Sequence, residues 1–292
     1  MNWRAERVEL PLSVPFTIAR GTTTVTENVV VTVEHGGETG HGAAAPAARY
    51  GETADTVEAV LPALFEAAEA VGDVHARRAI ADRMRGVVRD NPAARAAVDV
   101  ALWDLAGKLL DEPVFRLLGL SAAPDRRPAT SYTVGIAETA TMKRRAREAA
   151  DAGYPVLKLK LGSDRDRRGL RYVHERSPLP IAADESCRTA DDVAAVADRC
   201  DIANLKLMKT GGITPAVEAI HVARAHGLAV MCGCMLETDA AIAGAAQLLP
   251  LLDYADLDGS LLLETDPYAG VPVREGQFGL GDVEAGTGAA PR

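Results

Sequence analysis

Aromatic residues are scarce in this chain of 292 residues, where they make up 4%, and an excess of basic charge is absent. The 41 Asp and Glu residues outnumber the 32 Lys and Arg residues, which gives a net charge of −9. Proteins that bind nucleic-acid phosphates need a basic surface, so this balance argues against a nucleic-acid partner. The hydrophobic fraction of 48% and the charged fraction of 25% are ordinary for a globular protein, and they exclude disordered, collagen-like and coiled-coil classes.

Long apolar runs and an export signal are also missing. No stretch approaches the roughly 20 apolar residues of a membrane-spanning helix, and the N-terminal residues lack the apolar core of a signal peptide. Cysteines are too few and too clustered for the disulfide framework of a secreted protein. Walker and GxGxxG motifs are absent, so no nucleotide cofactor is indicated. We therefore expect a cytoplasmic protein with no membrane partner.

The first 120 residues mix strand and helix patterns. Residues 7–10 and 28–33 have the alternation and β-branched content of strands, and the polar stretch 16–24 between them is expected to be a loop. Residues 40–51 are rich in Gly, Ala and Pro and are expected to be irregular. Apolar residues at helical spacing predict helices over residues 53–88.

A further helix is predicted from Asn91 onward. Asn91 is a typical N-cap residue, and Pro92 follows it at the first helical position, where proline is favoured. The segment 121–128 is rich in Pro and Arg and reads as a linker, so we place a domain boundary there.

Beyond the linker, short strands alternate with helical stretches, which predicts a parallel α/β sheet that tends to close into a barrel. An eight-stranded barrel usually needs about 250 residues, and about 130 remain here. We therefore expect a shortened parallel (β/α) barrel of about six strands. The six strand candidates are residues 131–135, 156–161, 180–184, 203–208, 228–232 and 254–258.

Two lysines share one face of the second of these strands. Lys158 and Lys160 alternate with leucines, and because the leucines belong against helices, the lysines are expected to point into the barrel. Ammonium groups on an inward face are costly unless they are paired or functional. The alternative, a surface strand with solvated lysines, fits the leucine alternation less well.

Further charged residues stand at the tips of other strands. Taken alone, Asp184 is equally well explained as the N-cap of the following helix. Lysines on different strands that flank one carbon atom have the geometry to remove a proton from one face and return it to the other. A pair of aspartates on one face suits a substrate ammonium group. The additional inward candidates are Asp184, Lys206, Asp256 and Asp258.

These residues resemble motifs of the enolase superfamily, in its muconate-lactonizing subgroup, and within it the dipeptide epimerases of the L-Ala-D/L-Glu type. The resemblance runs over nearly the whole chain. The segments that carry it are 101–108, 158–160, 183–186, 204–212 and 256–258.

The resemblance implies a role for each candidate. Lys160 and Lys206 correspond to the two catalytic acid/bases, and Lys158 to an electrostatic helper. Asp184 corresponds to a ligand of Mg²⁺. Arg20 falls in the segment that resembles the mobile specificity loop. The remaining substrate-binding residues, which would hold the amino terminus of a dipeptide, are Asp256 and Asp258.

The sequence departs from this pattern between Lys160 and Asp184. Family members carry two more strands there, each ending in a further metal-binding carboxylate, and both strands are missing here. One carboxylate does not make a Mg²⁺ site, because hard cations take several oxygen ligands. Residues that remain as substitutes are Asp164, Asp166, Glu185 and Glu237.

The resemblance also divides the chain into three parts. Residues 1–125 correspond to an α+β capping domain, residues 126–262 to the shortened barrel, and residues 263–292 to a C-terminal segment that returns to the capping domain.

The function expected from these observations is that of a dipeptide epimerase-like isomerase, which transfers a proton at the α-carbon of a dipeptide or an amino-acid derivative. One alternative is a catalytically inactive paralogue that binds a ligand or a partner protein, and another is metal-free chemistry on a more acidic substrate. Missing βα units leave apolar edges uncovered, so we also expect a homo-oligomer.

Overall fold

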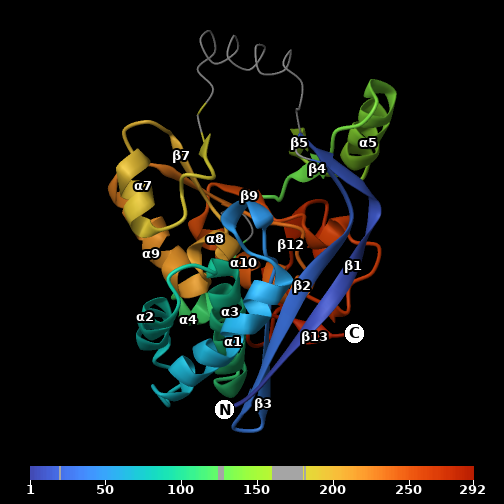
Figure 1. The fold of residues 1–292 in the computed structure, drawn as a ribbon. Coiled ribbons are helices and arrows are strands. Elements are labelled where there is room, and N and C mark those ends of the chain that lie inside the picture. The colour runs from blue at the N-terminus through green and yellow to red at the C-terminus, as the bar shows by residue number, and fades with distance from the viewer. Residues whose placement is uncertain (20, 124–127, 160–179, 181) are drawn as a thin grey trace.

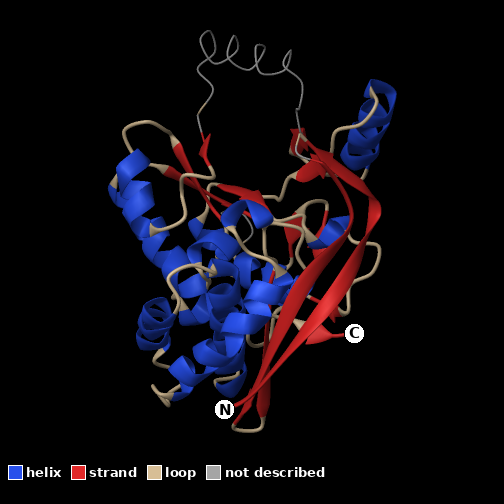
Figure 2. Cartoon of the chain, viewed as in Figure 1, coloured by secondary structure: helices blue, strands red, loops and turns tan. Residues whose placement is uncertain are grey.

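A long antiparallel sheet, a group of helices and an arc of parallel strands make up the protein (Figure 1). The computed structural model describes residues 1–19, 21–123, 128–159, 180 and 182–292. Figure 2 shows most of the helices gathered on one side of the long strands, with one helix apart from them at the upper right. None of the helices in these ranges is long and apolar enough to cross a membrane.

The N-terminal sheet contains β1 (Asn2–Ile18), β2 (Gly21–His35) and β3 (Glu38–Ala44) in that order. The expected loop at residues 16–24 is wrong, because the β1–β2 ladder continues to the pair Ile18 and Gly21. This stretch is rich in threonine, and β-branched residues favour a strand even where both faces are solvated.

The expectation of irregular structure from residue 40 is also wrong as far as Ala44, where β3 ends. A Cβ at Gly40 or Gly42 would collide with the backbone of Ala101 or Ala97 on helix α3 (Pro92–Leu109). The small residues therefore mark the close approach of a strand to a helix.

Helix α3 is the centre of this region and is buried along most of its length. Its start differs from the prediction, because Asn91 has a positive φ of 60° and its side chain makes no cap bond. The buried carboxylate of Glu52 accepts from the Ala93 N–H at 2.9 Å in its place. The neighbouring helices are α1 (Ala54–Glu69), α2 (Arg77–Val87) and α4 (Val114–Leu117).

All six predicted parallel strands are present in the described residues, with ends that differ from the expected ones. Strands β6 to β9 form one sheet, β4 and β5 form another, and a parallel bridge between Thr130 and Ala255 joins them. The arc therefore runs β5-β4-β9-β8-β7-β6. The strands are β4 (Tyr132–Val134), β5 (Leu157–Leu159), β6 (Ala182–Ala183), β7 (Ile202–Leu205), β8 (Ala229–Gly233) and β9 (Tyr254–Asp256).

Helices cover and connect these strands. In chain order they are α5 (Thr139–Asp151), α7 (Ala190–Val196), α8 (Leu207–Thr210), α9 (Ile213–Ala225) and α10 (Asp239–Ala246). Short pairs follow, with β10 (Tyr268–Ala269) beside β13 (Ala290–Pro291) and β11 (Val273–Arg274) beside β12 (Gln277–Phe278). The 3₁₀ helices are Ala48–Tyr50, Leu249–Leu251, Ser260–Leu262 and Leu280–Asp282.

The C-terminal segment is bound to α3 and β3 through one buried carboxylate. Asp104 accepts from the Thr287 N–H at 2.7 Å, from the His41 N–H at 2.8 Å and from Lys108 Nζ at 2.7 Å. Residue Asp104 is fully buried, so these bonds form away from water, where they are strongest. The division at residues 1–125, 126–262 and 263–292 stays a prediction.

Candidate functional site

A cavity of about 270 Å³ lies where the carboxyl ends of the parallel strands meet the tip of the β1–β2 hairpin. The Ile136 N–H donates to the Thr17 carbonyl at 2.8 Å, which fastens the hairpin tip beside the end of β4. Hairpin residues such as Phe16 and Ile18 give the cavity an apolar wall. The charged residues that line it are Lys158, Lys206, Asp256 and Asp258.

One half of the cavity is built on β5 and β9. Lys158 Nζ forms an ion pair with Asp256, whose second oxygen accepts from Ser131 Oγ at 2.5 Å. Asp258 accepts from the Thr133 N–H at 2.6 Å. Both aspartates are buried, and burial, followed by repulsion from Asp256, raises the pKa of Asp258 to about 6. Burial alone would lower the pKa of Lys158, but the Asp256 carboxylate raises it above its ordinary value.

The other half is built on β6, β7 and α8. Lys206 Nζ lies 3.2 Å from one oxygen of Asp184, and Lys209 Nζ lies 2.7 Å from the other. Burial would raise the pKa of Asp184, but the two lysines hold it below its ordinary value. The predicted strand over 203–208 is wrong beyond Leu205, because Lys206 is the N-cap of α8.

Sequence reasoning missed Lys209, whose side chain is completely buried. On a continuous strand Lys209 would face away from Lys206. The chain instead turns through one helical turn, which ends at Gly211 with a positive φ of 98°. The Gly-Gly pair at 211–212 was the available signal, since such residues end a short helix as readily as they follow a strand.

Two predicted site residues cannot be placed in this geometry. Lys160 and Arg20 lie outside the described residues, as do Asp164 and Asp166. Four of the seven predicted residues thus form ion pairs, Lys158 with Asp256 and Lys206 with Asp184. A fifth, Asp258, lines the same cavity as Lys158, Lys206 and Asp256.

The described residues do not offer a magnesium site. They contain no group of three His, Cys, Asp or Glu side chains arranged to hold a metal ion. Asp184 is engaged by two ammonium groups, and Glu185 is exposed, 3.7 Å from Arg49. Glu237 is buried after β8, where it accepts from the Met235 N–H at 2.6 Å, and burial raises its pKa to about 7. These donors do not fit Mg²⁺, which takes several oxygen ligands.

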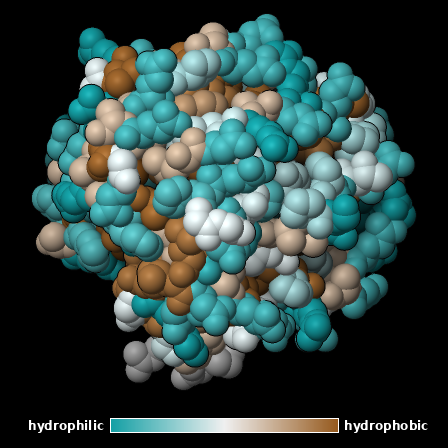
Figure 3. Space-filling model, turned by 90° about the horizontal axis from the view of Figure 1, so that it is seen from below, coloured by the Kyte–Doolittle hydropathy of each residue, from teal (hydrophilic) through white to brown (hydrophobic). Residues whose placement is uncertain are grey.

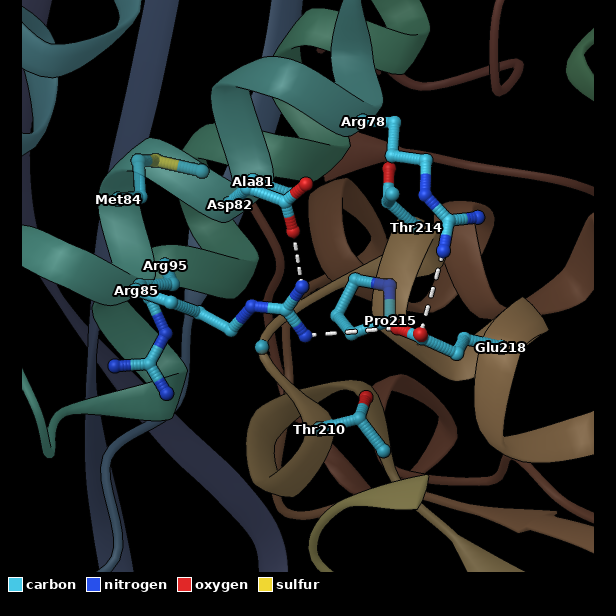
Figure 4. A pocket seen from close by; sticks show the side chains of 11 residues that line it. Arg78, Ala81, Asp82, Met84, Arg85, Arg95, Thr210, Thr214, Pro215 and Glu218 are labelled. Atoms are coloured by element: carbon cyan, nitrogen blue, oxygen red, sulfur yellow. Dashed lines mark hydrogen bonds and ion pairs between the residues drawn. The ribbon is translucent and has the colours of Figure 1, made fainter. Parts of the chain in front are cut away.

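A second cavity, of about 20 Å³, lies between α2 and α9 (Figure 4). Arg78 and Arg85 both pair with Glu218, and Arg85 also pairs with Asp82. Because its charges are satisfied by one another and it has little room, this cavity joins two helices and does not compete as a functional site.

Both halves of the chain match a known family. Residues 3–119 match the family described as Mandelate racemase / muconate lactonizing enzyme, N-terminal domain, and residues 163–290 match Enolase C-terminal domain-like.

Named relatives extend the match over almost the whole chain. The L-Ala-D/L-Glu epimerase of Bacteroides thetaiotaomicron is 32% identical, over 94% of this chain and 84% of that protein. The hydrophobic dipeptide epimerase of Flavobacteria bacterium is 32% identical, over 94% of each chain. The first alignment spans 327 positions, more than the 292 residues of this chain, so the relative has residues that this chain lacks.

Solved structures agree with the fold. The dipeptide epimerase from Enterococcus faecalis, in a complex with Mg and L-Leu-L-Tyr, has a TM-score of 0.86 and 27% identity, and covers 99% of this chain and 98% of its own. The dipeptide epimerase from Methylococcus capsulatus, in a complex with Mg and L-Arg-D-Lys, has a TM-score of 0.85 and 27% identity over 99% of both chains. The chain therefore belongs to the enolase superfamily, among the mandelate racemase and muconate lactonizing enzymes, and is an isomerase related to the dipeptide epimerases.

Proposed function

We propose that this protein epimerises a dipeptide by moving a proton at an α-carbon. The observation that carries the proposal is the meeting of Lys206, Lys158 and two buried aspartates at one cavity. By the family resemblance, Lys160 would act from the side opposite Lys206. The comparisons favour an enzyme over the alternative of a catalytically inactive paralogue.

In this mechanism the aspartates bind and the lysines move the proton. Asp256 and Asp258 hold the substrate ammonium group. Neutral Lys206 or Lys160 takes the α-proton, and the C–H electron pair moves into the adjacent carboxylate as an enediolate. The opposite lysine, as an ammonium, then protonates the other face, which inverts the carbon. Lys158 stays charged and stabilises the negative charge of the enediolate.

The apolar wall of the cavity favours one class of dipeptide. Phe16 and Ile18 of the hairpin line the cavity, as do Leu236 and Leu262. A substrate with an apolar side chain would bury surface there and gain about 25 cal/mol per Å². We therefore propose a dipeptide with one apolar side chain as the preferred substrate.

Mg²⁺ is present in the dipeptide complexes of the E. faecalis and M. capsulatus enzymes. When bound in such a site, a metal supplies counter-charge to an enediolate. The described residues of this chain supply only Asp184 in the corresponding place, and two lysines already neutralise it. We propose that Mg²⁺-dependent turnover is weak here, since the loss of even one stabilising group costs roughly 10²–10³ in rate.

The test is α-proton exchange in D₂O, followed by NMR, with L-Ala-L-Glu and L-Leu-L-Tyr as substrates. Loss of epimerisation in Lys206→Ala, with exchange lost from one epimer only, supports the epimerase, and faster exchange of L-Leu-L-Tyr supports the apolar preference. Rapid exchange that requires Mg²⁺ would contradict the proposal that Mg²⁺-dependent turnover is weak. Absence of exchange, together with dipeptide binding that is sensitive to Asp256→Asn, would favour a binding protein.

Self-association and a cytoplasmic location stay proposals. Val156, Leu157 and Tyr254, near the ends of the arc strands, are exposed large hydrophobic residues, and Figure 3 shows a further apolar patch among hydrophilic residues on the face seen from below. Exposed apolar surface of this kind is typical of protein interfaces. Light scattering should give a mass above the 30.7 kDa of one chain, and a clean monomer at micromolar concentration would contradict the proposal.

A further inference from the structure

An unpartnered acceptor lies beside Lys206 on the inner side of the arc. Asn204 precedes Lys206 by two residues in extended chain, so the two side chains lie on the same side. Asn204 is buried, with 4% of its surface exposed, and its Oδ1 has no hydrogen-bond partner among the described residues. A buried amide oxygen without a donor is destabilising, so its presence beside Lys206 indicates a functional role.

Gly233, the last residue of β8, leaves open the space between these two side chains. A Cβ at this position would lie 3.1 Å from Asn204 Oδ1 and 3.2 Å from Lys206 Cε. Both atoms therefore border the same small volume. Lys206 Nζ is one bond beyond Cε, so rotation of the side chain can carry it to the amide oxygen.

Lys209 holds the Asp184 carboxylate and the main chain at Asn204, and α8 holds the main chain of Lys206. Lys209 Nζ donates to the Asp184 carbonyl at 2.5 Å, to the Asp184 carboxylate at 2.7 Å and to the Asn204 carbonyl at 2.9 Å. The main chain of Lys206 is fixed by α8, since its carbonyl accepts from the Lys209 and Thr210 N–H groups. Among the described residues, the only ion pair of its Nζ is with Asp184, at 3.2 Å.

We propose that Asn204 is a positioning residue whose amide oxygen is a second acceptor for Lys206, and that Lys206 alternates between Asp184 and Asn204 during turnover. Asp184 holds the Lys206 ammonium group more tightly than a neutral amide can, because its carboxylate carries a full negative charge. The neutral amide holds the ammonium group near the cavity while leaving its proton available to the substrate. This consequence for turnover rests on the proposed function, whereas the contact itself does not.

Crystal structures of wild type and Asp184→Ala test the contact directly. Without the carboxylate, Lys206 Nζ should lie within hydrogen-bond distance of Asn204 Oδ1. Asn204→Asp keeps the size of the side chain and should draw Lys206 away from Asp184 in an otherwise complete site. The proposal is overturned if Nζ turns to Glu237, the other carboxyl group that interacts with Lys206. It is equally overturned if a water satisfies Asn204 while Lys206 stays in place.

Gly233→Ala tests the open space. The added methyl group should keep Lys206 on Asp184 and slow proton exchange about tenfold, because small displacements of catalytic groups have large effects on rate. Gly281→Ala is the matched control, since a Cβ there meets nothing within 4 Å. Unchanged exchange in Gly233→Ala would overturn the proposal.

Exchange from the two epimers separates positioning from a general structural role. Lys206 removes the proton of only one epimer, so Asn204→Ala should slow that exchange about tenfold and change the other much less. An equal loss for both epimers would overturn the proposal. If wild type exchanges no dipeptide, the proposed function fails, and the crystal structures still decide whether Lys206 moves to Asn204.

Discussion

Lys158 and Lys206 face the same cavity but are held in different ways. Lys158 pairs with Asp256, which is 2% exposed. Lys206 pairs with Asp184, which is 30% exposed and is shared with the completely buried Lys209. The Lys158–Asp256 pair therefore holds one charge in a fixed place. In the second group, Asp184 stays paired with Lys209 when Lys206 moves away.

This difference separates two chemical tasks. A group that transfers protons must lose and regain a charge and reach the substrate carbon. A group that stabilises developing charge works best when it is fixed in advance. The β5–β9 half, with Lys158, therefore suits binding and electrostatic stabilisation, and the β6–β7 half, with Lys206, suits proton transfer.

Lys206→Ala should have the largest effect on the rate of α-proton exchange. A small effect would contradict the assignment of proton transfer to Lys206. Removal of a catalytic acid/base should lower the rate of α-proton exchange from the epimer that it deprotonates by about 10²–10⁴, while dipeptide affinity changes little. Exchange in D₂O and calorimetric titration measure the two quantities. Lys143→Ala, an exposed lysine on α5, is the control and should behave as wild type. A similar loss in Lys143→Ala would show that the effect is not specific to the cavity.

Asp256→Asn tests the β5–β9 half of the cavity through its effect on the stability of the protein. It leaves the Lys158 ammonium group partly buried without its partner, so the free energy of unfolding should fall by about 3 kcal/mol. Urea denaturation measures the loss. Adding Lys158→Met should recover part of it, because the unpaired charge is then gone. Additive losses in the double variant would show that the pair is not coupled.

Lys209→Met tests the β6–β7 half of the cavity, in which two lysines share Asp184. The change leaves two strand-tip carbonyls and one oxygen of Asp184 without their donor, so we expect a loss of about 2 kcal/mol. The loss should be smaller than for Asp256→Asn, because Asp184 is partly exposed and keeps Lys206. Lys143→Met serves as the control in the same urea titrations. An unchanged free energy of unfolding would show that Lys209 does not tie β6 to β7.

The sequence predicted the parallel strands and most of the cavity, because these depend on local alternation. Lys158 follows from the leucines on either side of it, and Asp256 from its position at a strand end. Lys209 did not follow, since its direction depends on a helical turn that begins at Lys206. Glu52 as the cap of α3 was equally hidden, because it lies 41 residues before the N–H group that it accepts from. Contacts between distant segments leave no periodic signal.

Asp258→Asn should change the free energy of unfolding in the opposite direction, by an amount that depends on pH. The folded-state pKa of Asp258 is raised from 3.8 to about 6, so between these values the folded protein keeps a proton that the unfolded chain has lost. The free energy of unfolding of wild type therefore falls as the pH rises through this range, and the loss is complete above pH 6.

Asparagine has no charge to bury and still accepts from the Thr133 N–H. The variant should thus match wild type near pH 4 and be more stable by up to about 3 kcal/mol at pH 7, as measured by urea denaturation at both pH values. A difference that does not change with pH would contradict the raised pKa. Dipeptide affinity at pH 7 should fall in the same variant, because the Asp258 carboxylate is proposed to bind the substrate ammonium group. That role would explain why the chain keeps a carboxylate that lowers its stability.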